Sequence, residues 1–207
     1  GGIGLLGTRP SELAMAACDT LLIVGSSFPY ENWSPKMDQA RCVQIDADPA
    51  RLGLRYPVDV GLAGDSKATL QALIPLLTRK ADRSFLEEAQ KNMAEWRELL
   101  AVRSSRDDTP VKPQVVAHAV NELLDDNAIV TTDSGTITTW AARHINMKRE
   151  MQFSCSGNLA TMAPGLPSAI GAKAAYPDRQ VVAFVGDGVF SMLMADFVTA
   201  VKHDLPI

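Results

Sequence analysis

The sequence is poor in cysteine and in long apolar runs, and each scarcity excludes a class of protein. Its three cysteines (Cys18, Cys42 and Cys155) are odd in number, widely spaced and set in apolar contexts. This pattern predicts buried thiols in a reducing compartment rather than a disulfide framework or a metal site. No apolar run approaches the roughly 20 residues that span a bilayer, and no signal peptide opens the chain. We therefore expect a cytoplasmic protein; peripheral attachment at the inner face of the membrane stays open.

Basic clusters are also missing. The net charge is −4 and no block of Lys or Arg occurs, so no nucleic-acid surface is expected. With 46% hydrophobic and 21% charged residues, the composition is that of a globular protein of one large or two small domains. The pattern predicts an α/β fold with two Rossmann-like parallel-sheet domains, the second truncated at its C-terminus. We expect the first domain over 1–105, a polar linker with two prolines over 106–113, and the second domain over 114–207.

The first half alternates short apolar runs with turn signals. Strands are predicted over 20–24, 42–45 and 58–63. One helix is predicted to begin at Leu13, a second to follow the N-cap residue Asp65, and a third to cover 81–106. Gly2 to Gly7 matches G-x-G-x-x-G, but no strand precedes it and the helical pattern begins only after Ser11. We interpret this segment as a glycine-rich nucleotide-contacting loop, not as a strict Rossmann fingerprint.

Two strand ends in this half are candidate ligand contacts. The loop from Gly25 to Tyr30 follows the first strand, and Asp46 follows the second. Ligands of open parallel sheets bind beyond the carboxyl ends of the strands, where an acidic residue usually holds a ribose hydroxyl. The alternative is that Asp46 and Asp48 only shape the turn before Pro49.

The second half centres on Gly186-Asp187-Gly188. A buried strand is predicted over 181–185, and one continuous helical pattern follows from Phe190 to Val201. A strand that ends in this way offers backbone amides and a carboxylate to a phosphate and its metal ion. The alternative is a tight turn in which Asp187 only caps the helix. Upstream, helices are predicted over 114–124, 137–144 and 166–175, strands over 128–132 and 151–153, and an irregular loop over 157–165.

Other catalytic constellations find less support. The three histidines (His118, His144 and His203) lie on predicted helices at no metal-ligand spacing, which favours surface or packing roles. Ser134 and Ser156 lie outside any G-x-S-x-G pattern, so a hydrolase triad is not indicated.

Together these segments resemble the thiamine-diphosphate-dependent enzymes. V-V-A-F-V-G-D-G followed by F-S-M-L looks like the opening half of their cofactor motif. G-S-S-F-P-Y, Q-I-D-A-D-P-A, V-G-L-A-G-D, T-T-D-S-G-T and T-W-A-A-R resemble one group among them, the FAD-dependent pyruvate oxidases and quinone-dependent pyruvate dehydrogenases. The resemblance covers essentially all 207 residues.

The resemblance implies two cofactor sites. For FAD it implies contacts from the glycine loop (Ile3, Gly4, Leu5, Leu6), from the loop after the first strand (Ser26, Ser27, Phe28, Pro29, Tyr30), and from Asp46 near the adenosine ribose. For thiamine diphosphate it implies Ala160, Thr161 and Met162 under the aminopyrimidine, with Met162 enforcing the bent cofactor, and Gly186, Gly188 and Val189 against the diphosphate. Asp187 would ligate Mg²⁺. Val189 stands where the family often has glycine, and the loop from Gly157 to Ala160 lacks the usual His and Gly.

The function implied is oxidative decarboxylation of a 2-oxo acid such as pyruvate, with electrons passing through FAD to a quinone or O₂, in a homodimer or homotetramer. The resemblance places the activating glutamate before Gly1 and two asparagines after Ile207, so we expect a fragment that is inactive alone. Two alternatives stay open: an acetolactate-synthase-type carboligase with structural FAD, against which Phe28 to Tyr30 argues, and a non-catalytic nucleotide-binding module.

Overall fold

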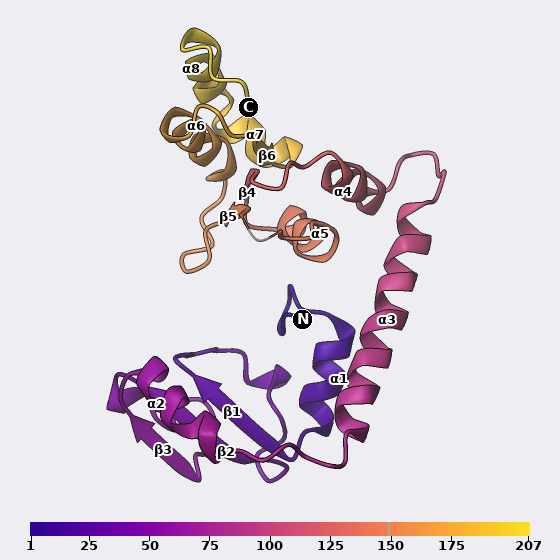
Figure 1. Ribbon diagram of the computed structural model, residues 1–207. Helices are drawn as coiled ribbons and strands as arrows, with labels where there is room; N and C mark the ends of the chain where they lie inside the picture. Colours follow the sequence, from indigo (N-terminus) through magenta and orange to yellow (C-terminus); the bar gives the residue numbers. More distant parts are fainter. Residues whose placement is uncertain (149) are drawn as a thin grey trace. The chain divides into compact units, whose positions relative to one another are not determined.

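The computed structural model describes residues 1–148 and 150–207, which form two compact units (Figure 1). The units cover 1–97 and 98–207, and the boundary between them falls inside helix α3 (Ser84–Ser104). Each unit is built on a parallel three-stranded sheet, so the predicted α/β class is confirmed. The predicted linker over 106–113 follows α3 and stays a prediction.

The sheet of the first unit has the order β1-β2-β3, from strands β1 (Thr20–Val24), β2 (Arg41–Asp46) and β3 (Val60–Ala63). The central strand β2 is the most buried of the three. Two 3₁₀ turns, η1 (Glu31–Trp33) and η2 (Pro49–Arg51), lie between successive strands. The amides of Gly25 and Gly64 donate to the carbonyls of Ile45 (2.8 Å) and Asp46 (2.9 Å), so all three strands end at one edge.

The helices of this unit follow the capping signals of the sequence. Helix α1 (Arg9–Ala17) begins earlier than predicted. A proline is tolerated in its first turn, because the backbone amide that proline lacks would have no partner within the helix there. Helix α2 (Ser66–Leu73) has Asp65 as its N-cap, whose carboxylate accepts from the Ala68 amide at 2.8 Å. It then tightens into η3 (Ile74–Leu76). On α3, the predicted apolar face is half-buried except for Phe85, which is exposed.

The second unit has the sheet order β5-β4-β6, from strands β4 (Ile129–Thr132), β5 (Gln152–Ser154) and β6 (Val181–Phe184). Helices α4 (Pro113–Glu122) and α5 (Thr136–His144) pack with Val130 and Phe184, whereas α6 (Gly165–Ala175) packs with Ile129 and Val181. Because side chains alternate along a strand, these two sets lie on opposite faces of the sheet. Figure 1 accordingly shows α6 apart from the α4–α5 pair.

The continuous helix predicted after Gly188 is wrong. The chain forms α7 (Asp187–Met192), a 3₁₀ turn η4 (Met194–Asp196) and α8 (Phe197–Lys202), with a non-helical residue at Leu193. In a straight helix, residues seven apart are separated by about 10.5 Å along the axis. The break lets the rings of Phe190 and Phe197 meet edge to face, with centroids 6.0 Å apart.

The cysteine prediction holds only in part. Cys42 is buried and burial raises the pKa of its thiol, but Cys155 is exposed, because the short strand β5 that precedes it is itself exposed. Among the described residues, no group of three potential ligands gathers to hold a metal ion. No helix in the same part of the chain is both long and apolar enough to cross a membrane.

Candidate functional site

The strand order of the second unit reverses at its central strand β4. From β4, the chain passes through α5 to β5 on one side, and then through α6 to β6 on the other side of β4. Thr132 pairs with Phe184 at the carboxyl ends of β4 and β6, and the Thr132 hydroxyl donates to the Phe184 carbonyl at 2.8 Å. Ligands of open α/β sheets bind at such a reversal of strand order. The loops beginning at Asp133 and Val185 therefore flank one potential ligand site.

The Gly186-Asp187-Gly188 turn lies at this edge. Gly186 is the N-cap of α7, and no side chain caps the helix. The Phe190 amide donates to the Gly186 carbonyl at 2.9 Å, and the Asp187 side chain is exposed in the first turn. The alternative in which Asp187 only caps the helix is therefore wrong. Its exposed carboxylate can meet a cation, while α7 is too short to add much dipole.

The predicted aminopyrimidine loop approaches the same edge through its last residues. Ala160, Thr161 and Met162 are exposed, and the Thr161 amide donates to the Ser156 hydroxyl at 2.9 Å. Ala160 and Ala163 have left-handed backbones, with φ of 50° and 63°. The loop thus presents residues 160–162 outward.

Asp133 is the functional candidate that the sequence reasoning did not single out. It follows β4 directly, is 1% exposed, and accepts the Gly165 amide on Oδ1 at 2.9 Å. Its Oδ2 is buried and has no hydrogen-bond partner among the described residues. A signal was present in the sequence, because Asp133-Ser134-Gly135 ends a buried strand just as Gly186-Asp187-Gly188 does.

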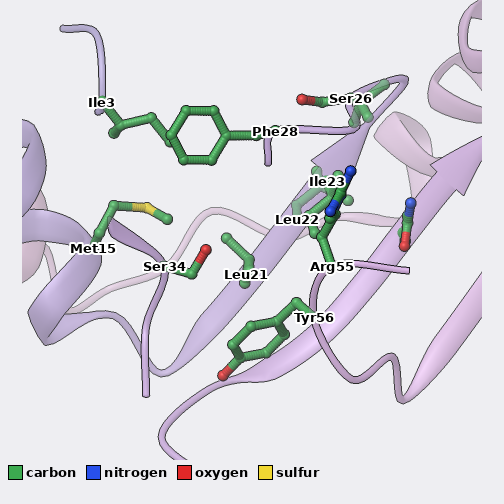
Figure 2. Close-up of a pocket in the computed structure, with 12 residues that line it drawn as sticks. Ile3, Met15, Leu21, Leu22, Ile23, Ser26, Phe28, Ser34, Arg55 and Tyr56 are labelled. Carbon is green, nitrogen blue, oxygen red and sulfur yellow. The ribbon is translucent and has the colours of Figure 1, made fainter. Parts of the chain in front are cut away.

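In the first unit, the predicted nucleotide loops meet at a cavity of about 220 Å³ (Figure 2). Ile3 comes from the glycine loop, and Ser26 and Phe28 come from the loop after β1. Figure 2 shows the Ile3 side chain reaching toward the Phe28 ring. Gly4, at φ 85°, brings its backbone so close that a Cβ there would lie 3.2 Å from the Phe28 ring. The volume is below the ~300–1,000 Å³ of whole-ligand pockets, so this cavity suits one part of a large ligand.

Other predicted flavin contacts lie outside the lining of this cavity. Leu5, Leu6, Ser27, Pro29 and Tyr30 are exposed and do not line it.

The structure also adds wall residues that the sequence analysis did not name. Gln44 accepts the Gly53 amide at 2.9 Å and donates to the Arg51 carbonyl at 3.0 Å. Arg55 is the only charged group among the described residues that line the cavity. The other additions are Met15, Ser34 and Tyr56, together with most of β1.

Asp46 ends the central strand β2 on the same face as Gln44. It is 5% exposed, and its Oδ1 accepts the Asp48 amide at 3.0 Å. Its Oδ2 is buried without a hydrogen-bond partner in the described part of the chain. The turn-shaping role therefore accounts for only one of its two oxygens, and the second can accept a hydrogen bond from a ligand hydroxyl.

The histidines occupy the packing and surface positions predicted for them. His144 is buried, and its ring nitrogen Nδ1 lies 3.3 Å from the Ser104 hydroxyl. Burial lowers the pKa of His144, and nearby His118 and Arg143 lower it further. His118 is half-buried and His203 is exposed.

Two family models match the chain. The central domain of the thiamine pyrophosphate enzymes matches residues 1–73, and their C-terminal TPP binding domain matches residues 133–207. The chain is 44% identical over 207 residues to YdaP of Bacillus subtilis, provisionally named a thiamine pyrophosphate-containing protein. It is 33% identical over 208 residues to a pyruvate oxidase of Lactiplantibacillus plantarum, and 31% identical over 214 residues to an acetolactate synthase large subunit of Pyropia yezoensis.

In each case the match includes the whole of this chain but only 36%, 34% and 36% of the relative's length. The chain thus spans about a third of the length of the curated relatives it matches.

Proposed function

Because this chain belongs to the thiamine pyrophosphate-dependent enzymes, we propose that it supplies the FAD site and half of the thiamine diphosphate site of a pyruvate-oxidising enzyme. The observation that carries the proposal is the exposed Asp187 carboxylate, which caps no helix and lies on a glycine turn at the end of β6. A hard cation that neutralises a diphosphate needs such an oxygen ligand.

The residues of the second unit fit the cofactor. Asp187 would ligate Mg²⁺, and Gly186, Gly188 and Val189 would lie against the diphosphate. Residues 160–162 would support the aminopyrimidine, with the 56% exposed side chain of Met162 free to pack against it. Thiamine diphosphate, when bound, supplies the electron sink that decarboxylation of a 2-oxo acid requires.

The first unit fits FAD. The buried Oδ2 of Asp46 has no donor among the residues that the structure describes, and a ribose hydroxyl would provide one. The Phe28 ring and Ile3 offer apolar contact, and Arg55 offers a cation to the dinucleotide phosphates. Electrons would leave the flavin for a quinone or O₂.

Purified full-length protein tests both cofactors. We expect flavin absorbance, and a rise in Tm on adding thiamine diphosphate with Mg²⁺; saturation at 100 times Kd corresponds to about 2.7 kcal/mol. Asp187→Asn should abolish that rise, whereas Asp178→Asn, at an exposed aspartate of the same unit, should keep it. Absence of both flavin and stabilisation in the wild-type protein would favour a non-catalytic nucleotide-binding module.

A second candidate is a carboligase with structural FAD, which the acetolactate synthase relative favours. Anaerobic addition of pyruvate separates the two candidates. The oxidising enzyme bleaches its flavin band, whereas a structural flavin stays oxidised.

A further inference from the structure

We propose that Asp133 and Thr131 form a clamp on Gly165 that positions the aminopyrimidine loop; this inference rests on the function proposed above. The clamp is defined by two buried hydrogen bonds. The Gly165 amide donates to Asp133 Oδ1 at 2.9 Å, and the Thr131 hydroxyl donates to the Gly165 carbonyl at 2.7 Å. Both polar backbone groups of one residue are thus held by the side chains of a β4 residue, Thr131, and of the residue that directly follows β4, Asp133.

The two holding residues are set by the strand itself. Residues two apart on a strand face the same way, so Thr131 and Asp133 both meet the first residue of α6. Each is 1% exposed. The carbonyl of Asp133 accepts the Thr138 hydroxyl, which ties the clamp to α5. The two holding residues are therefore fixed both by the strand and by α5.

Gly165 also packs closely against Val185, which directly precedes the turn of the predicted metal site. A Cβ at this residue would lie 2.5 Å from Val185 Cγ1 and 3.2 Å from Asp133 Oδ1. Val185 immediately precedes Gly186, and Gly165 immediately follows the loop over 160–164. One glycine thus couples the loop to the diphosphate turn, and only a residue without a side chain fits there.

The loop needs such an anchor because its backbone is strained. Ala160 and Ala163 adopt left-handed conformations, which disfavour residues with a Cβ. Strained backbone persists only where the surroundings hold it. Gly165 is the first helical residue after this segment, so its two hydrogen bonds hold the end of the loop nearest the sheet.

The chemistry of Asp133 fits a positioning role. Its Oδ2 has no hydrogen-bond partner within residues 1–148 and 150–207, so the carboxylate satisfies no second donor there. One acceptor oxygen is enough to hold the Gly165 amide, and an asparagine would retain it. Asp133→Asn is therefore the conservative variant, and Asp133→Ala removes the contact.

Hydrogen exchange of the unliganded full-length protein tests the clamp directly. Asp133→Ala should accelerate exchange of the peptide over 157–166 about 10- to 150-fold, the range expected for losing a hydrogen bond to a charged group. Asp133→Asn should exchange at a rate closer to the wild type than to Asp133→Ala, because its side-chain oxygen can still accept the Gly165 amide. Unchanged exchange in Asp133→Ala, or equal acceleration across the whole second unit, would overturn the clamp.

Ligand affinity separates positioning from general support. With Mg²⁺ present, Asp133→Ala should weaken thiamine diphosphate binding about tenfold and leave inorganic pyrophosphate binding within about twofold. Equal weakening of thiamine diphosphate and pyrophosphate binding in Asp133→Ala would overturn the positioning role. Asp187→Asn, which removes the proposed metal ligand, should weaken both and is the reference for that result. If the wild-type protein binds no thiamine diphosphate, the proposed function fails, whereas the exchange experiment still decides the clamp.

A steric pair provides an independent variant. Gly165→Ala should accelerate hydrogen exchange of the loop as Asp133→Ala does. Adding Val185→Ala should reverse most of this acceleration, because it removes the Val185 Cγ1 methyl group that would lie 2.5 Å from the new Cβ. A Gly165→Ala protein with wild-type exchange and affinity would contradict the close packing on which the clamp depends.

Discussion

Replacing Asp46 by asparagine is expected to weaken FAD binding while stabilising the flavin-free protein. Oδ1 of Asp46 is occupied by the Asp48 amide at 3.0 Å, and an asparagine oxygen can keep that bond. The change then falls on the second position, where the buried Oδ2, which has no partner in the described part of the chain, becomes an NH₂ group. A ribose hydroxyl loses its charged acceptor there, and the turn stays intact.

The magnitude follows from the kind of bond that is lost. A hydrogen bond to a charged group contributes about 1.5–3 kcal/mol, which corresponds to about a 10- to 150-fold rise in the Kd of FAD. In the flavin-free protein the same substitution is expected to be neutral or stabilising. A buried carboxylate oxygen without a partner costs more than a neutral amide, so the free energy of unfolding should rise or stay level.

Two titrations of deflavinated full-length protein measure these effects: FAD binding followed by flavin fluorescence, and unfolding by urea. Asp48→Asn is the matched control, because it changes the same charge two residues away on an exposed side chain. A variant that binds FAD like the wild type would refute the ribose assignment. Equal loss of FAD affinity and of apo stability would mean that Asp46 acts only on the fold.

Three further predictions use other contacts. Arg55→Gln should weaken FAD binding about tenfold at low salt and less at high salt, whereas Arg51→Gln, outside the cavity, should not. Burial lowers the pKa of His144, so its contribution to stability is present above the unfolded pKa of about 6.5 and is lost as the pH falls through the folded pKa. His144→Gln should therefore reduce the change in the free energy of unfolding, measured with urea, between about pH 5 and 7. His203→Gln is the control and should leave that change as it is in the wild type. Asp65→Ala should lower the free energy of unfolding of the first unit by about 1 kcal/mol, since it removes the N-cap of α2.

The strands and most helices could be predicted because their signals are local. Strand β1 matches its predicted bounds, since a short β-branched run between turn residues permits few other structures. The Asp65 cap was predicted correctly for the same reason. The break at Leu193 could not be predicted, because the apolar pattern continues through it. The contact between Phe190 and Phe197 across the break depends on tertiary packing.

The candidate site could be proposed from the sequence only where it follows strand ends. The loops after β1, β2 and β6 were identified because a parallel sheet gathers its carboxyl ends at one edge. Arg55 and Gln44 were not identified, since nothing in their local sequence shows that their side chains reach the cavity. The burial that leaves one oxygen of Asp133 unpaired arises only when α6 covers the end of β4.

Asp46 ends the central strand of its sheet and Asp133 directly follows the central strand of the other sheet. Within the described residues, each has one carboxylate oxygen that accepts a backbone amide and one without a hydrogen-bond partner. The same Asp→Asn substitution is nevertheless expected to act differently. At Asp46 the occupied oxygen serves a local turn, so the unpaired oxygen carries the proposed ligand contact and the amide loses it. At Asp133 the occupied oxygen holds Gly165, which the amide preserves. FAD affinity should therefore fall in Asp46→Asn, and thiamine diphosphate affinity should survive in Asp133→Asn; equal losses of the two affinities would contradict this division of roles.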